Sequence, residues 1–221
     1  MTNYLHDNIK RRGLMFVISA PSGTGKTTLA KLLMKHDQHL RLCTSFTTRA
    51  KRPGEVDGQD YTFITKEKFN KMIEEDQFME YVEIFGHFYG TPKSFVNKML
   101  SSGEDALFDV DWQGHKKLTA TARDDVTSVF ILPPSKTILY NRLISRHAND
   151  KELVKARQAR ADDEISHWHE YDYVIINKDI DEALSKLIAI LKAERLRKNR
   201  RTGLPSFVKD LMAEKIENID I

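Results

Sequence analysis

Short apolar runs alternate along the chain with segments of helical period. The runs LMFVIS, DALFDV, VTSVFIL and YVII predict strands covered on both faces, as in a parallel sheet. After the first run, Leu29, Leu32 and Leu33 lie on one face of a helix predicted from Thr28 to His36. Such an alternation favours one α/β domain in which a parallel sheet is flanked by helices.

The first strand continues into SAPSGTGKTT, a loop that leads into a helix. Gly23 and Gly25 allow backbone angles that turn successive amides toward a phosphate, while Lys26 reaches its oxygens and Thr27 is placed to hold Mg²⁺. The helix start adds unpaired amides and the positive end of its dipole. The full phosphate-loop pattern begins with glycine where this chain has Ala20. An ordinary glycine-rich turn would need all the other features to coincide, so we expect a nucleoside triphosphate site.

Composition limits the alternatives. With 221 residues the chain is long enough to bury the core of one domain. Its formal charge of +3 gives no evidence for a nucleic-acid partner, and none is expected. Cys43 is the only cysteine, so no internal disulfide is expected, and the N-terminus lacks the apolar core of a signal peptide. No run reaches membrane-spanning length. These features predict a protein of the reducing cytoplasm.

A charged loop follows the first helix, after the short alternating strand in RLCTSF. Arg49, Lys51 and Arg52 stand beside hydroxyl side chains, including that of Ser45, and are equipped to bind a second phosphate through bidentate hydrogen bonds. The alternative is a solvated surface loop.

Aromatic and acidic residues alternate in FMEYVEIFGHFYGTPKSF. A strand-like arrangement would let Glu80, Tyr89 and Thr91 converge on a flat polar ligand. Thr91 is also a candidate cap for a helix that begins with Pro92 and runs to Gly103. Residues 41–103 are therefore expected to form a binding insertion.

Two acids, Asp109 and Asp111, end the strand in DALFDVDWQG. Ligands of parallel sheets bind at the carboxyl edge, so these carboxylates fit a magnesium or substrate role, whereas strand-end turn residues are the alternative. Further on, Ser135 is the expected cap of the helix KTILYNRLISRH.

Arginines recur at helical spacing in that helix and in the next helical run. Arg142 and Arg146 lie one turn apart, and Arg157 and Arg160 follow. Like charges at this spacing repel unless an anion lies between them, and a polyphosphate would serve. A charged helical surface is the alternative.

The last part of the chain carries weaker signals. Asn177 follows the final strand, where an adenine could lie, and the basic segment ERLRKNRRTG is expected to be a solvated helix end. Residues 1–13 are expected to be a loose polar lead-in. The segment SFVKDLMAEKIENIDI predicts a separate amphipathic helix. Such a helix is compatible with a homodimer.

Six blocks together resemble the guanylate kinase family: SAPSGTGKTT, TSFTTRAKRPGEVDGQDYTF, FMEYVEIFGHFYGTP, FDVDWQG, FILPPS and VIINKDID. They occur in the family's order over residues 14–201. The resemblance implies a phosphate-loop fold with a core (14–40, 104–135 and 171–200), a GMP-binding region (41–103), a helical lid (136–170) and a C-terminal tail (201–221). It also implies transfer of the γ-phosphoryl group of ATP to GMP, and to dGMP, for guanine nucleotide supply and recycling.

The resemblance assigns roles to individual residues. It implies ATP contacts from Ala20, Pro21, Ser22, Gly23, Thr24, Gly25, Lys26, Thr27, Thr28 and Asn177. It implies GMP contacts from Ser45, Arg49, Arg52, Tyr61, Glu80, Tyr89, Thr91 and Asp111. Catalytic charge would come from Lys26, Arg49, Arg142, Arg146 and Arg157, and Mg²⁺ would be held by Thr27 and, through water, by Asp109. Carboxylates suit guanine because its N1 and N2 atoms are donors.

Two other readings remain open. A non-catalytic guanylate-kinase-like scaffold that binds peptides would lack parts of the ATP site, but Lys26, Thr27 and the lid arginines are present. A kinase for another nucleoside monophosphate, or a phosphate-loop ATPase, would share the loop. Glu80 and Asp111 favour guanine over uracil or thymine.

Overall fold

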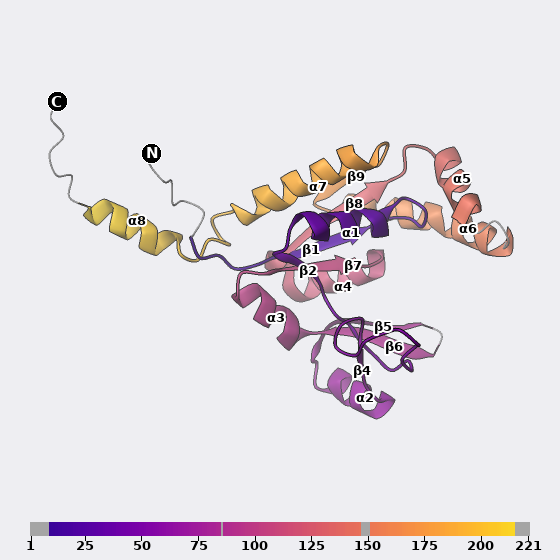
Figure 1. The fold of residues 1–221 in the computed structure, drawn as a ribbon, viewed down its shortest axis with the longest axis horizontal. Coiled ribbons are helices and arrows are strands. Elements are labelled where there is room, and N and C mark those ends of the chain that lie inside the picture. The colour runs from indigo at the N-terminus through magenta and orange to yellow at the C-terminus, as the bar shows by residue number, and fades with distance from the viewer. Residues whose placement is uncertain (1–8, 85, 147–150, 215–221) are drawn as a thin grey trace.

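The computed structural model describes residues 9–84, 86–146 and 151–214, and their centre is a parallel sheet (Figure 1). Its strand order is β2 (Leu40–Leu42), β7 (Asp105–Asp109), β1 (Met15–Ser19), β8 (Val126–Leu132) and β9 (Tyr173–Ile176). Every pairing in it is parallel. The carboxyl ends of all these strands therefore point to one edge, where open α/β sheets bind ligands.

Helices cover both faces of this sheet. On one face α1 (Lys26–His36) and α7 (Ile180–Arg195) pack through Leu29, Leu33 and Leu187 against alternate residues of the strands. On the other face α3 (Lys93–Ser101) and α4 (Trp112–Ala122) contribute Val96 and Leu118 to a second core cluster. A short 3₁₀ turn, η2 (Arg123–Asp125), leads from α4 into β8. The predicted fold, a parallel sheet flanked by helices, is confirmed.

A second, smaller sheet lies below the main sheet in the view of Figure 1. Its order is β4 (Thr62–Phe63), β3 (Phe46–Thr47), β6 (His87–Pro92) and β5 (Phe78–Ile84), with α2 (Lys66–Glu74) alongside. Its own core centres on Phe69, whose ring stacks on Phe78 at 4.4 Å between centroids. The expected insertion covers residues 41–103, and the elements of the small sheet lie within residues 46–92. At the two ends of the expected range, β2 pairs with β7 in the main sheet and α3 packs on the core of the main sheet.

A helical arm follows β8 and ends where β9 begins. It consists of α5 (Lys136–Arg146), α6 (Lys151–Ser166) and the 3₁₀ turn η3 (His167–Glu170). Leu139 and Leu143 of α5 pack against α6 in a small core of their own. The predicted cap is confirmed, since Ser135 Oγ accepts a hydrogen bond from the amide of Ile138 at 3.2 Å. This arm lies at the end of the molecule opposite the C-terminal helix (Figure 1).

Two expectations about charged termini are wrong. Residues 9–13 are not a loose lead-in, because Arg11 forms a bidentate pair with the fully buried Asp105 and Arg12 pairs with Asp125. The basic end of α7 is not simply solvated either. Arg195 bonds the same Asp105 at 2.7 Å, and Arg200 is buried beside Glu194. These arginines face acids contributed by distant segments, which local sequence cannot indicate.

The chain continues into α8 (Leu204–Ala213), which confirms the separate helix expected there as far as Ala213; residues 215–221 of the expected tail, like residues 1–8, lie outside the described residues. Within the described ranges, none of the helices has the length and apolar character to cross a membrane.

Candidate active site

The loop between β1 and α1 has the geometry of a phosphate cradle. Gly23 and Gly25 adopt φ values of +90° and +98°, the left-handed region that glycine tolerates best. The buried Thr24 donates its hydroxyl to the carbonyl of Pro21 at 2.6 Å, which holds the turn closed. Gly25 is the N-cap of α1 and has no side chain to cap the first turn, so the amides of that turn are left for an anion.

Lys26, the first residue of α1, reaches across to the end of β7. Its Nζ lies 2.5 Å from Asp109 Oδ1 and donates to the carbonyl of Val110 at 3.2 Å. The strand order makes this contact possible, since β7 lies directly beside β1. The structure thus brings together the lysine of the phosphate loop and the acid expected to serve magnesium. Thr27 and Thr28, in the same turn of α1, have exposed side chains.

The helical arm contacts the phosphate loop through charged side chains. Arg157 of α6 donates from Nη1 to the hydroxyl of Ser22, and Arg142 of α5 donates to the carbonyl of Thr24 at 3.4 Å. Glu164 of α6 accepts from the amide of Ser22 at 3.3 Å, and burial raises the pKa of this carboxyl group although that bond opposes the rise. Two of the three expected lid arginines therefore lie at the loop.

Arg146 is the last residue of α5, and its side chain lies outside what the structure describes. Ala20 and Pro21, expected near ATP, form the first part of the loop. Asn177 is placed at the loop as well, but as a buried residue. Its Nδ2 donates to the carbonyl of Thr24 at 2.7 Å, so its amide fixes the loop backbone.

Glu80 and Thr91 meet across β5 and β6 of the small sheet. They are register partners, and the Thr91 hydroxyl donates to Glu80 Oε1 at 2.8 Å. Ser45 Oγ lies 3.4 Å from Thr91 Oγ1. Burial raises the pKa of Glu80; the bond from Thr91 and the charge of Lys117 oppose this rise, and Asp111 adds to it. Asp111 is followed by α4, and that helix contacts β5, since Lys117 Nζ donates to the carbonyl of Tyr81, the neighbour of Glu80, at 2.6 Å.

The structure also shows which residues cap α3 and α4. Thr91 is not the cap of α3, because Pro92 occupies the N-cap position and the Thr91 hydroxyl is turned to Glu80. Asp111 is the N-cap of α4, and its Oδ1 accepts from the amide of Gly114 at 2.9 Å. This bond fixes the Asp111 side chain at the edge of the main sheet.

Three of the expected GMP-phosphate residues, Arg49, Tyr61 and Tyr89, lie together. The Arg49 guanidinium lies 5.5 Å from the centre of the Tyr61 ring, and the rings of Tyr61 and Tyr89 meet edge to face at 5.8 Å. Glu55 holds Arg49 through a bidentate pair with distances of 3.1 and 2.7 Å. Arg52 is exposed, and its backbone amide donates to Glu55. Arg49 is thus held in place by Glu55, whereas Lys51 and Arg52 are exposed, as in the solvated alternative.

Together, a phosphate loop at the edge of a parallel sheet, a lysine on its first helix and an arginine-bearing helical arm define a nucleotide-binding phosphate-loop kinase. The sequence pattern of the guanylate kinase family matches residues 12–194, and the chain belongs to that family. It is 52% identical over 208 residues to the guanylate kinase of Nitrobacter winogradskyi, covering 94% of this chain and 95% of that protein. The identity to the guanylate kinase of Maricaulis maris is 52% over 205 residues, with 93% and 94% covered.

A solved structure agrees in fold. The crystal structure of guanylate kinase from Anaplasma phagocytophilum superposes with a TM-score of 0.70 at 33% identity, over 94% of this chain and 99% of that one.

Two acids of the site were missed by reasoning from the sequence. Glu55 lies within the charged loop, and its spacing of six residues from Arg49 was an available signal for a pair within one loop. Glu164 gave no such signal, since it meets Ser22 across 142 residues of chain.

Proposed function

We propose that this guanylate kinase phosphorylates GMP, and dGMP, with ATP as the phosphoryl donor, giving GDP or dGDP and ADP. The observation that carries the choice of base is the Glu80 carboxylate, which accepts a hydrogen bond from Thr91 at 2.8 Å, and Asp111 is the second acid assigned to the base. Two acids suit guanine, whose N1–H and N2–H donate, and they do not suit a base that presents acceptors at these positions.

The phosphate of GMP would bind at the charged loop around Arg49. Arg49, Tyr61 and Tyr89 already lie together there. Ser45 lies beside Thr91. Arg52 is exposed and would turn in to the bound phosphate. Glu55 keeps the Arg49 fork in place, so the guanidinium is oriented before the substrate arrives.

ATP would bind with its phosphates in the loop from Ala20 to Thr28. Lys26 would exchange Asp109 for the β- and γ-phosphate oxygens, while Arg142 and Arg157 reach the transferring group from the helical arm. Asn177 would support the nucleotide indirectly, by holding the Thr24 carbonyl. We assign the lid to residues 136–170 and the GMP-binding region to 41–103, and expect Arg146 to join Arg142 when both nucleotides are bound.

The residues at the loop also fit Mg²⁺. Thr27 and Asp109 supply hydroxyl and carboxylate oxygens, the hard ligands that this ion prefers, and the contact of Asp109 with Lys26 shows that the acid reaches the loop. When bound, the ion would neutralise charge on the β- and γ-phosphates. Few protein ligands are needed, because Mg²⁺ bound to nucleotides keeps several waters and phosphate oxygens.

In this reaction the protein aligns the two nucleotides and neutralises the charge of their phosphates. A 5′-phosphate oxygen of GMP attacks the γ-phosphorus of ATP and the bond to the β,γ-bridging oxygen breaks, so no covalent enzyme intermediate is needed. Lys26, Arg49, Arg142 and Arg157 would offset the charge of the two approaching anions. A non-catalytic scaffold would have no use for these charges at the loop.

The test is a coupled assay of ADP formation with ATP and each of GMP, dGMP, AMP, UMP and CMP. We expect kcat/KM for GMP and dGMP to exceed that for the other three by at least about 100-fold, since the unsuited bases offer no donors to the two carboxylates. A Lys26→Ala preparation controls for contaminating kinases. Comparable rates with AMP or UMP would rule out the proposed acceptor.

A further inference from the structure

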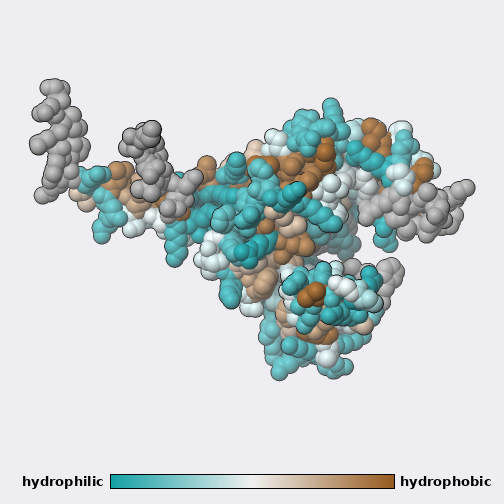
Figure 2. Space-filling model, in the orientation of Figure 1, coloured by the Kyte–Doolittle hydropathy of each residue, from teal (hydrophilic) through white to brown (hydrophobic). Residues whose placement is uncertain are grey.

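The helix α4 lies between the main sheet and β5 of the small sheet in the view of Figure 1. It packs on the core of the main sheet through Leu118, and it also contacts β5. Figure 2 shows that the small sheet joins the body of the protein on one side, whereas a hollow separates the two on the other. Side chains at this joint therefore determine how the small sheet is held against the main sheet.

A β-bulge in β5 lies at the joint. Phe78 pairs with Pro92, and the next register pair is Glu80 with Thr91. Met79 is therefore an extra residue between the two pairs. The Phe78 side chain packs in the core of the small sheet, whereas the Met79 side chain packs in the core cluster that α3 and α4 form with the main sheet. Bulges redirect side chains and are frequent next to active sites. This one lets β5 enter both cores directly before Glu80.

Two side chains of α4 contact the backbone of β5 on either side of Glu80. Lys117 Nζ donates to the carbonyl of Tyr81 at 2.6 Å, and it lies 5.0 Å from the centre of the Tyr81 ring. Thr121, one turn further along α4, has its hydroxyl oxygen 3.4 Å from the carbonyl oxygen of Met79. Residues four apart share one side of a helix, so both side chains face β5. Lys117 makes the shorter of the two contacts.

The same helix begins next to the second acid assigned to guanine. Asp111 is the N-cap of α4, and its Oδ1 accepts from the amide of Gly114 at 2.9 Å. Along a helix axis Asp111 and Lys117 are about 9 Å apart at 1.5 Å per residue, and the hydrogen bonds of the helix keep that separation fixed. One rigid element thus carries Asp111 and holds the strand that carries Glu80.

We propose that Lys117 is a positioning residue for guanine: by holding the Tyr81 carbonyl, it fixes Glu80 relative to Asp111 so that both carboxylates meet the purine. This inference rests on the proposed function, because it requires that these two acids recognise the base. Lys117 itself touches no substrate in this account. It determines specificity through β5, and its own side chain is exposed.

Lys117 also acts on the charge of Glu80. Burial raises the pKa of the Glu80 carboxyl group. The hydrogen bond from Thr91 and the positive charge of Lys117 oppose this rise, whereas the charge of Asp111 adds to it. The buried Cys43 thiol does not interfere, because burial, aided by the charge of Glu80, raises the pKa of Cys43 to about 12 and keeps the thiol neutral. Removal of the Lys117 charge should therefore raise the pKa of Glu80.

Steady-state kinetics of Lys117→Met test the proposal, with each nucleotide varied in turn while the other is saturating. Methionine is also unbranched, but it removes both the donor and the charge. The KM for GMP should rise about tenfold, the low end for loss of a hydrogen bond to a charged group, while kcat and the KM for ATP stay within about threefold. The kcat/KM for AMP should also stay within about threefold, because adenine does not depend on the two acids. Lys117→Arg keeps donor and charge and should restore the KM for GMP.

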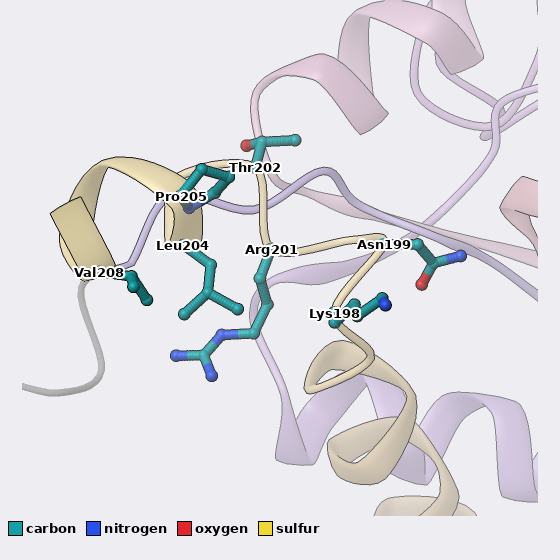
Figure 3. Close-up of a pocket in the computed structure, with 7 residues that line it drawn as sticks. All are labelled: Lys198, Asn199, Arg201, Thr202, Leu204, Pro205 and Val208. Carbon is teal, nitrogen blue, oxygen red and sulfur yellow. The ribbon is translucent and has the colours of Figure 1, made fainter.

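The pH profile separates this role from a general structural one. The acid limb of kcat/KM for GMP should move to higher pH in Lys117→Met and stay in place in Lys117→Arg. Two controls make the same change of charge. Lys116→Met alters the exposed neighbour on α4, and Lys198→Met alters the shallow groove at the base of α8 (Figure 3). Both should keep the KM for GMP within about twofold and leave the limb in place.

The outcomes distinguish this inference from the proposed function. If Lys117→Met matches Lys116→Met in the KM for GMP and in the acid limb, the inference is overturned. A joint loss of kcat and of ATP affinity would overturn it too, since that pattern indicates a general structural role. Neither result affects the proposed function as long as the unmodified chain prefers GMP to AMP and UMP. Equal use of the three nucleotides by the unmodified chain would overturn both.

Discussion

The hydrogen bond from Thr91 to Glu80 gives a prediction that connects the small sheet to substrate choice. Thr91→Val keeps the shape of the side chain and removes the donor that lies 2.8 Å from Glu80 Oε1. This bond favours the ionised carboxylate against the effect of burial, which raises the pKa of Glu80. Loss of this bond therefore raises the pKa of Glu80 further. When the pH is lowered, Glu80 of the variant is protonated at a higher pH than Glu80 of the unmodified enzyme, and the ionised form that guanine requires is then lost.

The size of the effect follows from the strength of such a bond. A hydrogen bond to a charged group contributes about 1.5–3 kcal/mol, and one pH unit corresponds to about 1.4 kcal/mol. The acid limb of kcat/KM for GMP, measured against pH, should therefore move up by about one to two pH units. The titration of the GMP phosphate contributes equally to both proteins and leaves this difference unchanged.

Steady-state kinetics from about pH 5 to 9, with saturating ATP and limiting GMP, measure the limb directly. Thr119→Val is a matched control, because Thr119 lies on α4 and its hydroxyl is 3.1 Å from a nitrogen of His115. A Thr91→Val limb that coincides with that of the unmodified enzyme would refute the assignment of Glu80 as the group whose ionisation guanine needs.

Three further predictions concern charge. Lys26→Ala should lower kcat about 1,000-fold and change the KM for GMP far less, and a kcat within tenfold would contradict its role. Arg157→Ala should lower kcat about 100-fold, whereas Arg160→Ala on the same helix should stay within about threefold; equal losses would contradict a specific lid contact. Asp105→Asn should lower the free energy of unfolding, measured in urea, by about 3–5 kcal/mol, because two arginines lose a fully buried partner. The control is Glu182→Gln in an exposed pair, which should lower it by less than about 0.5 kcal/mol.

Apolar periodicity was sufficient to predict the main sheet. Its strands are buried on both faces, so runs such as LMFVIS stand out whatever lies around them. The phosphate loop was predictable for a related reason, since Gly23, Gly25 and Lys26 act within one short segment. Ser135 was likewise recognisable as a cap because it bonds an amide three residues on.

Contacts between distant segments could not be predicted in this way. Arg195 resembles a solvated residue at a helix end, yet it meets Asp105 across 90 residues of chain. Asn177 was predicted to lie beside the adenine, yet its amide bonds the Thr24 carbonyl across 153 residues. Thr91 satisfies the local pattern of a helix cap, but the strand pairing turns its hydroxyl to Glu80. In each case the partner is set by strand order, which local composition does not encode.

The central claim is that one edge of the sheet gathers two nucleotides and that paired acids recognise the purine of the acceptor. A crystal structure with bound GMP tests it most directly. The account predicts the guanine N1 and N2 atoms at about 2.7–3.1 Å from carboxylate oxygens of Glu80 and Asp111, with the phosphate at Arg49. A guanine ring bound elsewhere, with both carboxylates facing only solvent, would contradict the account.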